Sequence, residues 1–561
     1  MTYNYAGQKT SMSDPDMGGW SYDYDGAGNL ILQTDARGCQ LHMGYDALNR
    51  LTSQSSSGGC GTPVNTTYTY DDPTSGIYGI GRRTSMSDGS GSTTWTYDAR
   101  GHLTGETKTI NGGGAFATQW AYDSAGLLTS MTYPDGETVP YTYNDRMLPY
   151  NMGCDGSSGQ GGCSAEYVVS SQYDSAGRLT ERVLGTSYAV PLPPTATPTP
   201  TLTATPTLTA TPTPTATSTR TATPTRTATP YKTEPPPTAT PTRTATPTWT
   251  ATPTVVDAVT AIGGGGGCLR CPRSPNNSAG LSAASGSVYS TSSLIPSPLR
   301  LSYSYYDWTS QGGRLHTLSA AYDANGVQLQ NLAYNYDAAG DVTALTDALM
   351  AGGSQTQTYT YDALNRLTSA HTTGGSYGQY NETYDYDSNG NLWHKGNSAL
   401  QYNNGAHAHA VSAVDANAYG YDPNGNMTTR TVNGQTFTLA YDAENRLVSA
   451  TGPSMNAGFT YDGDGQRVAQ TINGVTTYFV GNYYEATNGA VTKYYYAGTQ
   501  RIAMRQNGEV YFLLSDQLGS TSVAVNDTGT VVDNVYYKPW GAARGTGALS
   551  GRLHAHGLPI L

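Results

Sequence analysis

The 561-residue sequence has few charged side chains, few phenylalanines and few cysteines. Charged residues make up 12% of the chain, about half of the roughly 25% that is usual in soluble globular domains. A helical enzyme would need far more Leu, Glu, Lys and Ala at a 3.6-residue period, so this composition argues against one. The net charge of -12 argues against a nucleic-acid-binding protein, which needs a basic stripe to hold phosphates.

Long apolar runs are also missing. The sequence contains no run of about 18 apolar residues, so it predicts no membrane-spanning helix. The N-terminus lacks a basic segment followed by an apolar one, and it therefore shows no secretory signal. No P-loop and no HExxH motif occurs. We therefore expect no catalytic residues, no bound metal and no cofactor.

The six cysteines are too few for a disulfide scaffold. Cys154 and Cys163 flank a loop rich in Gly and Ser and could close a small bridge. Cys268 and Cys271 have the spacing of a redox or zinc half-site, but no second pair follows that would complete four zinc ligands. We interpret this second pair as inert thiols in a connector.

What the sequence does contain is a repeat. Twelve segments share the frame Tyr-Asp-x-x-(Gly/Asn), and their aspartates are Asp25, Asp46, Asp98, Asp123, Asp174, Asp323, Asp337, Asp362, Asp387, Asp422, Asp442 and Asp462. The fifth position of the frame is Gly nine times and Asn three times. Among these turn positions are Gly28, Asn49, Gly101, Gly126, Gly177, Gly340, Asn365, Gly390 and Asn445.

Turn geometry explains the frame. Asp favours the first position of a type I turn, because its carboxylate accepts a hydrogen bond from the backbone two residues later. The residue three positions after the Asp must then adopt a left-handed backbone, which Gly and Asn do at little cost. A type I turn followed by such a residue forms a β-hairpin with a bulge. The sequence therefore predicts an all-β fold of tandem hairpins that repeat about every 20 to 27 residues.

The high tyrosine content fits the same repeat. The chain has 45 Tyr against 5 Phe, and one Tyr precedes each of the twelve aspartates. Tyr is a favoured strand residue, and ring pairs across strands stabilise a sheet. The alternative is that some rings form stacking platforms for sugars. The tryptophans considered for that role are Trp20, Trp95, Trp120, Trp308 and Trp393.

The repeats define the expected domain organisation. Residues 1–190 form a first repeat block and residues 301–475 a second one. Between the blocks, residues 191–254 are a Thr/Ala/Pro-rich linker that holds 16 of the 30 prolines and is predicted to be disordered. Residues 255–300 continue as a Gly/Ser-rich connector. This linker either loops out of one sheet or separates two.

The tandem Tyr-Asp-x-x-Gly-Arg-Leu-Thr pattern resembles the YD-repeat, or RHS-repeat, family. A second pattern in residues 511–541 resembles the RHS-repeat-associated core, which we assign to residues 476–545. The core motif matches at Asp516, Leu518, Gly519, Ser520, Thr521, Tyr537, Pro539 and Gly541. The expected family pattern stops at about residue 550, so residues 546–561 form a divergent tail. Met1 also enters in the middle of a degenerate repeat unit, and we expect an internal fragment.

The resemblance implies a long sheet of hairpins that spirals into a shell. In bacteria such shells enclose a C-terminal toxin, and other members are surface proteins that contact carbohydrate. We therefore expect a non-catalytic shell fragment of a secreted or cell-surface protein, with a toxin absent from this chain as its partner. The alternative is a surface adhesin that binds cell-surface glycans. No nucleic acid and no membrane-spanning segment is expected.

Three further motifs suggest chemistry. Self-cleavage in the family uses an Asp-Pro-x-Gly segment, and the one at 422–425 lies in an ordinary repeat turn, so we expect no autoproteolysis. The oxygens around Asp422 and Asp462 resemble halves of calcium loops, but no bidentate Glu follows at the required distance. His407 with His409, and His554 with His556, are interpreted as solvated loop histidines.

Overall fold

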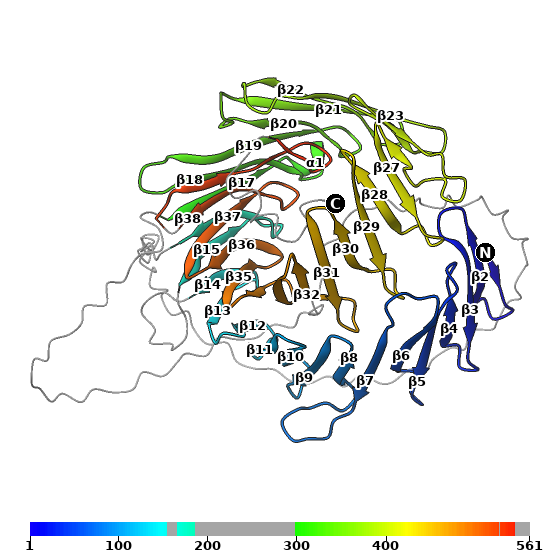
Figure 1. Ribbon diagram of the computed structural model, residues 1–561. Coiled ribbons are helices and arrows are strands. Elements are labelled where there is room, and N and C mark those ends of the chain that lie inside the picture. Colours follow the sequence, from blue (N-terminus) through cyan, green and yellow to red (C-terminus); the bar gives the residue numbers. More distant parts are fainter. Residues whose placement is uncertain (154–164, 186–297, 527, 545–561) are drawn as a thin grey trace, which may run out of the picture. The chain divides into compact units, whose positions relative to one another are not determined.

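The computed structural model describes residues 1–153, 165–185, 298–526 and 528–544 (Figure 1). These residues form 41 strands and one short helix, α1 (Trp308–Gln311). The predictions that concern Cys154 and Cys163, residues 191–297 and residues 546–561 lie outside the described residues. No helix in the described ranges is long and apolar enough to cross a membrane.

The first repeat block, block 1, contains sixteen strands. Their bounds are β1 (Thr2–Tyr3), β2 (Lys9–Asp14), β3 (Gly18–Tyr24), β4 (Leu30–Thr34), β5 (Cys39–Tyr45), β6 (Leu51–Gly58), β7 (Asn65–Tyr70), β8 (Arg83–Asp88), β9 (Gly91–Tyr97), β10 (Leu103–Ile110), β11 (Gly114–Tyr122), β12 (Leu128–Thr132), β13 (Thr138–Tyr143), β14 (Pro149–Gly153), β15 (Glu166–Tyr173) and β16 (Leu179–Leu184).

The second repeat block, block 2, begins with β17 (Leu299–Tyr305), so the predicted boundary at residue 301 falls inside a strand. The next strands are β18 (Leu315–Tyr322), β19 (Gln328–Tyr336), β20 (Val342–Asp347), β21 (Gln355–Tyr361), β22 (Leu367–Gly374), β23 (Asn381–Tyr386), β24 (Leu392–Lys395), β25 (Ser398–Gln401), β26 (Ala413–Val414), β27 (Asn417–Tyr421), β28 (Met427–Val432), β29 (Gln435–Tyr441), β30 (Leu447–Gly452), β31 (Met455–Tyr461) and β32 (Arg467–Ile472). Block 2 is followed by the C-terminal strands of the segment assigned to the core, namely β33 (Val475–Val480), β34 (Tyr484–Thr487), β35 (Ala490–Ala497), β36 (Gln500–Gln506), β37 (Glu509–Ser515), β38 (Thr521–Asn526), β39 (Val531–Asn534), β40 (Tyr536–Tyr537) and β41 (Ala543–Arg544).

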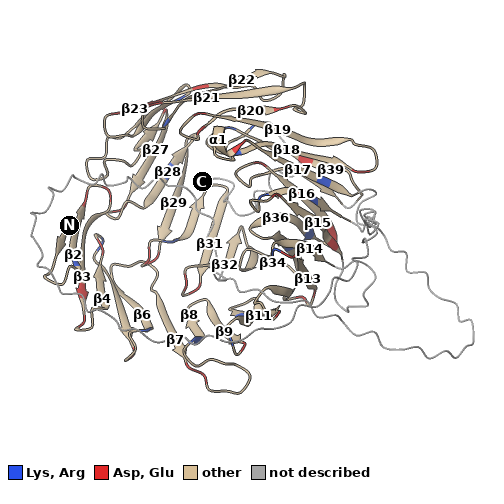
Figure 2. Ribbon diagram, turned by 180° about the vertical axis from the view of Figure 1, so that it is seen from behind, with Lys and Arg blue, Asp and Glu red and all other residues tan. Residues whose placement is uncertain are grey.

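The first 39 strands form one antiparallel sheet in which each strand pairs with the next along the chain. Figure 1 follows this order by colour. The pairing continues from β16 to β17, where Leu184 lies opposite Leu299, so the two blocks share one sheet. The prediction of an all-β fold of tandem hairpins is confirmed. Figure 2 shows how sparse the charged residues are along the strands.

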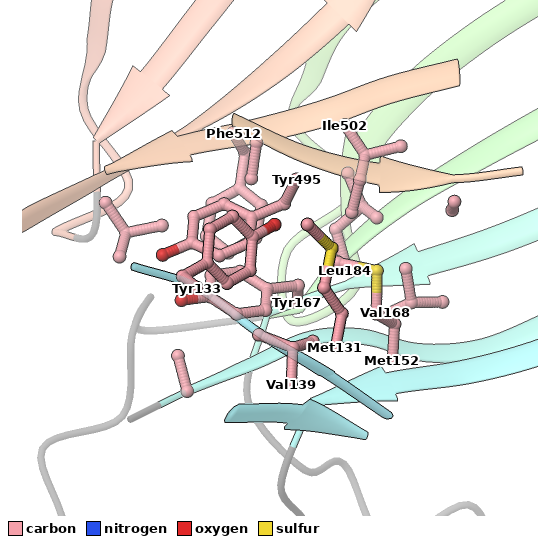
Figure 3. Close-up of a cluster of buried hydrophobic side chains, with 14 of the residues drawn as sticks. Met131, Tyr133, Val139, Met152, Tyr167, Val168, Leu184, Tyr495, Ile502 and Phe512 are labelled. Carbon is pink, nitrogen blue, oxygen red and sulfur yellow. The ribbon is translucent and has the colours of Figure 1, made fainter. Parts of the chain in front are cut away.

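The largest core cluster draws side chains from both blocks. Figure 3 shows Tyr133 and Tyr167 of block 1 beside Tyr495 and Phe512 from the C-terminal strands. The rings of Tyr167 and Tyr495 stack with their centroids 3.8 Å apart. These four side chains are almost completely buried. Burying large aromatic surfaces is strongly stabilising, so this cluster joins segments that lie more than 300 residues apart in the sequence.

Candidate functional site

The repeat turns share one geometry. In the turn at Asp46, the Asp46 amide donates to the Arg50 carbonyl and the Asn49 amide donates back to the Asp46 carbonyl, both at 3.0 Å. The Asp46 Oδ1 accepts from the amides of Leu48 and Arg50 at 2.8 and 2.9 Å. Asn49 has a left-handed backbone with φ of 61°. Eleven of the twelve predicted units show this pair of backbone bonds.

The unit at Asp323 differs. Its amide donates to the Pro298 carbonyl, and the Gly326 amide donates to the Tyr322 carbonyl instead of to Asp323. The Asp323 carboxylate binds Arg300 through two hydrogen bonds of 2.6 and 2.8 Å. This Asp therefore fastens the start of block 2 rather than closing a repeat turn.

The repeat geometry also occurs outside the twelve predicted units. The degenerate unit at the N-terminus forms such a turn from Asn4 to Gln8. Sequence reasoning missed the turns that begin at Asp35 and Asn144. The first has a Gly three residues later but no Tyr before it. The second has the Tyr but places Met147 at the left-handed position, with φ of 59°. An Asp followed by Gly at the third position would have identified the turn at Asp35.

The core motif uses the same turn. The Gly519 amide donates to the Asp516 carbonyl at 3.1 Å, and the Asp516 amide donates to the Ser520 carbonyl at 2.9 Å. A second such turn runs from Lys538 to Ala542, with Gly541 at the left-handed position. The core segment thus extends the hairpin series.

In many hairpins, a tyrosine hydroxyl forms a hydrogen bond with a backbone carbonyl of the preceding hairpin. Leu51 pairs with Tyr45 and Ser53 with Gly44, so the register shifts at Thr52 and the ladder is interrupted. The Leu51 carbonyl instead accepts a hydrogen bond of 2.9 Å from the Tyr70 hydroxyl. Ten tyrosines donate to the carbonyl five residues after the start of a turn, namely Tyr24, Tyr45, Tyr70, Tyr173, Tyr305, Tyr361, Tyr386, Tyr402, Tyr461 and Tyr537.

This bond explains why Tyr rather than Phe stands at these ten positions. A buried or half-buried carbonyl outside the ladder needs a donor, and Phe offers none. An arginine completes the link in four units. Arg50 donates to Asp46 at 2.7 Å, and its guanidinium lies 4.4 Å from the centre of the Tyr70 ring. The same pairing joins Arg178 to Tyr305, Arg366 to Tyr386 and Arg446 to Tyr461. We call this set of contacts the repeat latch.

The turn at Asp462 docks onto block 1. Its carboxylate accepts a hydrogen bond of 2.6 Å from Lys108, and the pair is buried, with side-chain exposures of 3% and 10%. The Tyr68 hydroxyl donates to the Gly463 carbonyl at 2.9 Å. The Gly463 amide donates to the Asp88 carboxylate at 2.8 Å. We call the contact between the block 2 turns and block 1 the seam.

The turn at Asp442 docks in a similar way. The Ala443 amide donates to the Thr62 carbonyl at 3.3 Å, and the Arg37 guanidinium donates to the Asp442 carbonyl at 3.1 Å. The Gln54 amide donates to Glu444 at 2.9 Å. Burial at this contact raises the pKa of the Glu444 carboxyl.

The turn at Asp422 makes the third seam contact. The Asn424 amide group donates to the carboxylate of Asp35. The His407 ring lies 2.6 Å from the Asp16 carbonyl, and the His409 amide donates to the Asp16 carboxylate at 2.7 Å. His407 is 4% exposed, so its interpretation as a solvated loop residue is wrong. Its ring is buried because the loop packs against block 1.

The contacts at the seam do not favour calcium binding by the turns at Asp422 and Asp462. A Lys or Arg lies close to each carboxylate of interest, Lys108 at Asp462 and Arg37 3.7 Å from Asp422. Within the residues that the structure describes, no three His, Cys, Asp or Glu side chains gather as a metal site would require. The Asp422–Gly425 segment is an ordinary repeat turn in its backbone hydrogen bonds.

A disulfide joins Cys39 to Cys60 beside the seam. Sequence reasoning did not identify this pair, because the two cysteines lie 21 residues apart in different strand-loop segments. Both are almost fully buried and pack with Val64 and Ala443.

A buried polar cluster forms around Glu137, next to the main core. The hydroxyls of Tyr167 and Tyr495 donate to its carboxylate at 2.8 and 2.6 Å. Lys493 forms ion pairs with Glu137 and, at 2.7 Å, with Asp135. Burial raises the pKa of both tyrosines. The cluster is a further polar tie between block 1 and the C-terminal strands.

A cavity of about 140 Å³ lies where the core motif meets the strands of block 2. Its lining includes Asp516, Leu518, Tyr537 and Pro539 of the core motif, together with Asp347. Burial raises the pKa of both aspartates. The two carboxyls are therefore more easily protonated than those of the exposed turns.

Buried Arg544 anchors the end of the described chain near this cavity. It donates to the Gly378 carbonyl at 3.0 Å and to Gln355, and it lies over the Tyr380 ring. Lys538 pairs with Glu382 at 2.6 Å. These contacts hold the core segment against the repeat sheet.

Comparison with known families gives two matches. The teneurin YD-shell model matches residues 309–544, and the RHS-repeat model matches residues 24–62 and 109–138. Among characterised proteins, the chain is 31% identical over 143 residues to the tRNA3(Ser)-specific nuclease WapA of Bacillus spizizenii. That alignment covers 23% of this chain and 6% of the nuclease.

Solved structures share the fold. The TcdB2-TccC3 complex aligns with a TM-score of 0.64 at 14% identity, over 96% of this chain and 25% of that chain. TcdB2-TccC3 without its hypervariable C-terminal region gives a TM-score of 0.63 at 14% identity, over 96% and 24%. The Photorhabdus luminescens Tc holotoxin pore gives 0.65 at 14% identity, over 96% and 24%. The chain thus spans about a quarter of these neighbours, and the likeness concerns the fold.

Proposed function

This chain belongs to the YD-repeat, or RHS-repeat, family, and from that premise we propose that it is a non-catalytic shell segment of a secreted or cell-surface bacterial protein that encloses a toxin. The YD-shell fold is a structural one. In this proposal the toxin is the partner of the shell. In the same proposal residues 1–190 are the first repeat block, residues 191–254 the linker and residues 255–298 the connector. The second block runs from Leu299, the start of β17, to residue 475, and residues 476–545 are the core.

The repeat latch is the observation that supports a structural role most directly. The turn aspartate, the arginine and the tyrosine of a unit such as Asp46, Arg50 and Tyr70 all bind one another or the backbone. Their polar groups are thus committed to holding successive hairpins together. A wall needs such a linkage along its whole length, whereas an enzyme concentrates polar groups in one cleft.

Protease protection tests the enclosing role. A short peptide with one protease site is fused after Leu561 of the full chain, and a matched fusion carries the same peptide before Met1. If the wall encloses the segment C-terminal to the core, the C-terminal peptide should be cleaved more slowly, with the difference abolished in denaturant. Equal cleavage rates in the native chain would contradict the proposal.

The absence of enzyme activity belongs to the same proposal. The Asp422–Gly425 segment is engaged at the seam through Asn424, which supports a structural use of the one Asp-Pro-x-Gly string. We expect the purified chain to keep its full mass during long incubation, as followed by mass spectrometry. A fragment that ends near residue 425 would show that this segment is cleaved.

Carbohydrate binding is the second candidate, and exposed tryptophans favour it. Trp308, Trp393 and Trp540 expose 61%, 46% and 48% of their surface, and an exposed indole offers a flat apolar face to a sugar ring. A glycan array with the full chain tests this role. If Trp393 forms the binding platform, Trp393→Ala should abolish the glycan signal. Trp95 is buried, so Trp95→Ala would lower the signal only by disturbing the fold.

A further inference from the structure

The Cys39–Cys60 disulfide lies where the Asp442 turn meets block 1. The Cys39 sulfur lies 3.9 Å from the Ala443 carbonyl oxygen, and the Ala443 amide donates to the Thr62 carbonyl two residues after Cys60. Asp442 and Thr62 form a parallel bridge. One short segment, residues 58–64, therefore carries both the disulfide and a backbone contact of the seam. We call it the docking loop.

The docking loop is packed tightly on both sides. A side chain at Gly59 would meet the Arg37 carbonyl oxygen at 2.9 Å, and one at Gly61 would meet the Tyr441 carbonyl oxygen at 2.7 Å. Gly61 also has a left-handed backbone with φ of 63°. Glycine-rich loops are flexible when nothing holds them, so a covalent tie from Cys60 to Cys39 fixes this loop in the shape that receives the turn.

The neighbouring Asp462 turn docks by different means. Its carboxylate pairs with Lys108, and Asp464 binds Arg83 through two hydrogen bonds. The Asp442 turn instead relies on Gln54, on the carbonyl of Thr62 and on Arg37. Ion pairs hold one docked turn onto block 1, whereas the other rests on a loop that a disulfide shapes.

We propose that oxidation of Cys39 and Cys60 completes the docking site for the Asp442 turn, so that this part of the seam closes firmly only after the chain enters an oxidising compartment. Two thiols lose two protons and two electrons to form the bridge, and a second disulfide, from a small molecule or a protein, accepts the electrons and is reduced to two thiols. Because both sulfurs are buried, the bridge resists reduction once the seam has closed.

This inference goes beyond the shell role, and hydrogen exchange tests it on the full chain. The wild-type chain is folded either with oxidised glutathione or with a reductant throughout. In the reduced chain we expect the Ala443 amide to exchange on the order of a hundred times faster, as the loss of a bridge between cysteines 21 residues apart implies. The Gly463 amide, which binds Asp88, should exchange equally in both states and serves as the internal reference.

Two variants isolate the bridge from the other thiols. The double variant Cys39→Ala with Cys60→Ala, folded with oxidised glutathione, should reproduce the fast exchange at Ala443. Gly61→Ala keeps both cysteines but obstructs the contact with Tyr441, so it should show fast exchange at Ala443 in both redox states. Equal exchange at Ala443 in the oxidised and reduced wild-type chains, with the seam intact in both, would overturn the proposal.

Discussion

The exposed turns and the seam turns share one local structure but play different roles. The turns at Asp46 and Asp362 face solvent, and their carboxylates, 23% and 24% exposed, bind the arginine of their own turn. The turns at Asp442 and Asp462 have the same backbone bonds, yet both aspartates are 3% exposed and lie against block 1. The local sequence therefore sets the shape of a turn, and the distant strand beside it sets its role.

The energetic consequence depends on burial. An exposed ion pair gains little, because water solvates both charges well when they separate. A buried charge that loses its partner keeps its desolvation cost and gains nothing in return. Substitutions at the seam should therefore cost more than the matched substitutions at exposed turns, and the first two of the four tests below measure that difference.

The largest effect is expected at Lys108. Lys108→Ala leaves the buried Asp462 carboxylate without its ion-pair partner, which should cost about 3 to 5 kcal/mol of unfolding free energy. The matched change Arg366→Ala at the exposed Asp362 turn should cost about 1 kcal/mol or less. Urea unfolding of the full chain measures both. Similar losses for the two variants would remove the distinction between seam and exposed turns.

The second test compares two turn glycines. Gly390 and Gly425 both have left-handed backbones, with φ of 89° and 83°. A Cβ at Gly390 meets nothing closer than the Arg366 guanidinium at 3.8 Å, whereas one at Gly425 meets the Asp16 carbonyl oxygen at 2.6 Å. Gly390→Ala should cost about 1 to 2 kcal/mol from backbone strain alone.

Gly425→Ala should cost about 1 to 3 kcal/mol more, because the new methyl group pushes against block 1. The unfolding midpoints of the two variants in the same denaturant give the difference. If Gly425→Ala is no worse than Gly390→Ala, the Asp422 turn does not dock as tightly as the structure shows.

How far the sequence predicts these features depends on the distance between the groups involved. The turn at Asp98 and Gly101 follows from residues three apart, since the left-handed position requires Gly or Asn. The pairing of Lys108 with Asp462 joins residues 354 apart, and no local pattern specifies it. The Cys39–Cys60 bridge falls between these cases, because loop length alone does not select one pairing among six cysteines.

The repeat latch shows a second limit of prediction from sequence. The sequence places a Tyr before every predicted turn, and strand propensity alone accounts for the ring. Propensity does not reveal the role of the hydroxyl, because its acceptor lies in the preceding hairpin and becomes available only where the register shifts, as at Leu367 beside Tyr361. The composition of 45 Tyr and 5 Phe therefore does not tell which tyrosines act through their hydroxyl groups.

The third test removes one latch hydroxyl. Tyr386→Phe deletes the bond of 3.0 Å to the Leu367 carbonyl but keeps the ring beneath Arg366. The loss should be about 1 kcal/mol, the usual net value of one hydrogen bond. Tyr122→Phe is the control, because Tyr122 stacks on His102 and is not one of the ten latch tyrosines. Removing its hydroxyl should lower the unfolding free energy by only about a few tenths of a kcal/mol. If Tyr386→Phe and Tyr122→Phe lower the unfolding free energy equally, the ring of Tyr386 and not its hydroxyl makes the stabilising contact.

The smallest effect is a difference in pH dependence between two turns of the same geometry. The backbone amide of Arg50, together with its guanidinium, lowers the pKa of Asp46. Burial beside the core cavity raises the pKa of Asp516, against the effect of its own backbone bonds. Asp46 therefore adds stability above the unfolded-state pKa of about 3.9 and loses it as pH falls further, whereas Asp516 adds stability at low pH and loses it as pH rises through its folded pKa.

Asp46→Asn and Asp516→Asn keep a side-chain oxygen for the turn amides and change the net charge equally, so they form a matched pair. As pH rises from 3 to 7, Asp46→Asn should lose stability relative to the wild-type chain, because the variant lacks the carboxylate that the fold favours at neutral pH. Asp516→Asn should become relatively more stable over the same range, because it removes a carboxylate that burial disfavours. Melting temperatures at the two pH values, each compared with the wild-type chain, should therefore shift in opposite directions, and parallel shifts would show that burial at the core cavity does not govern Asp516.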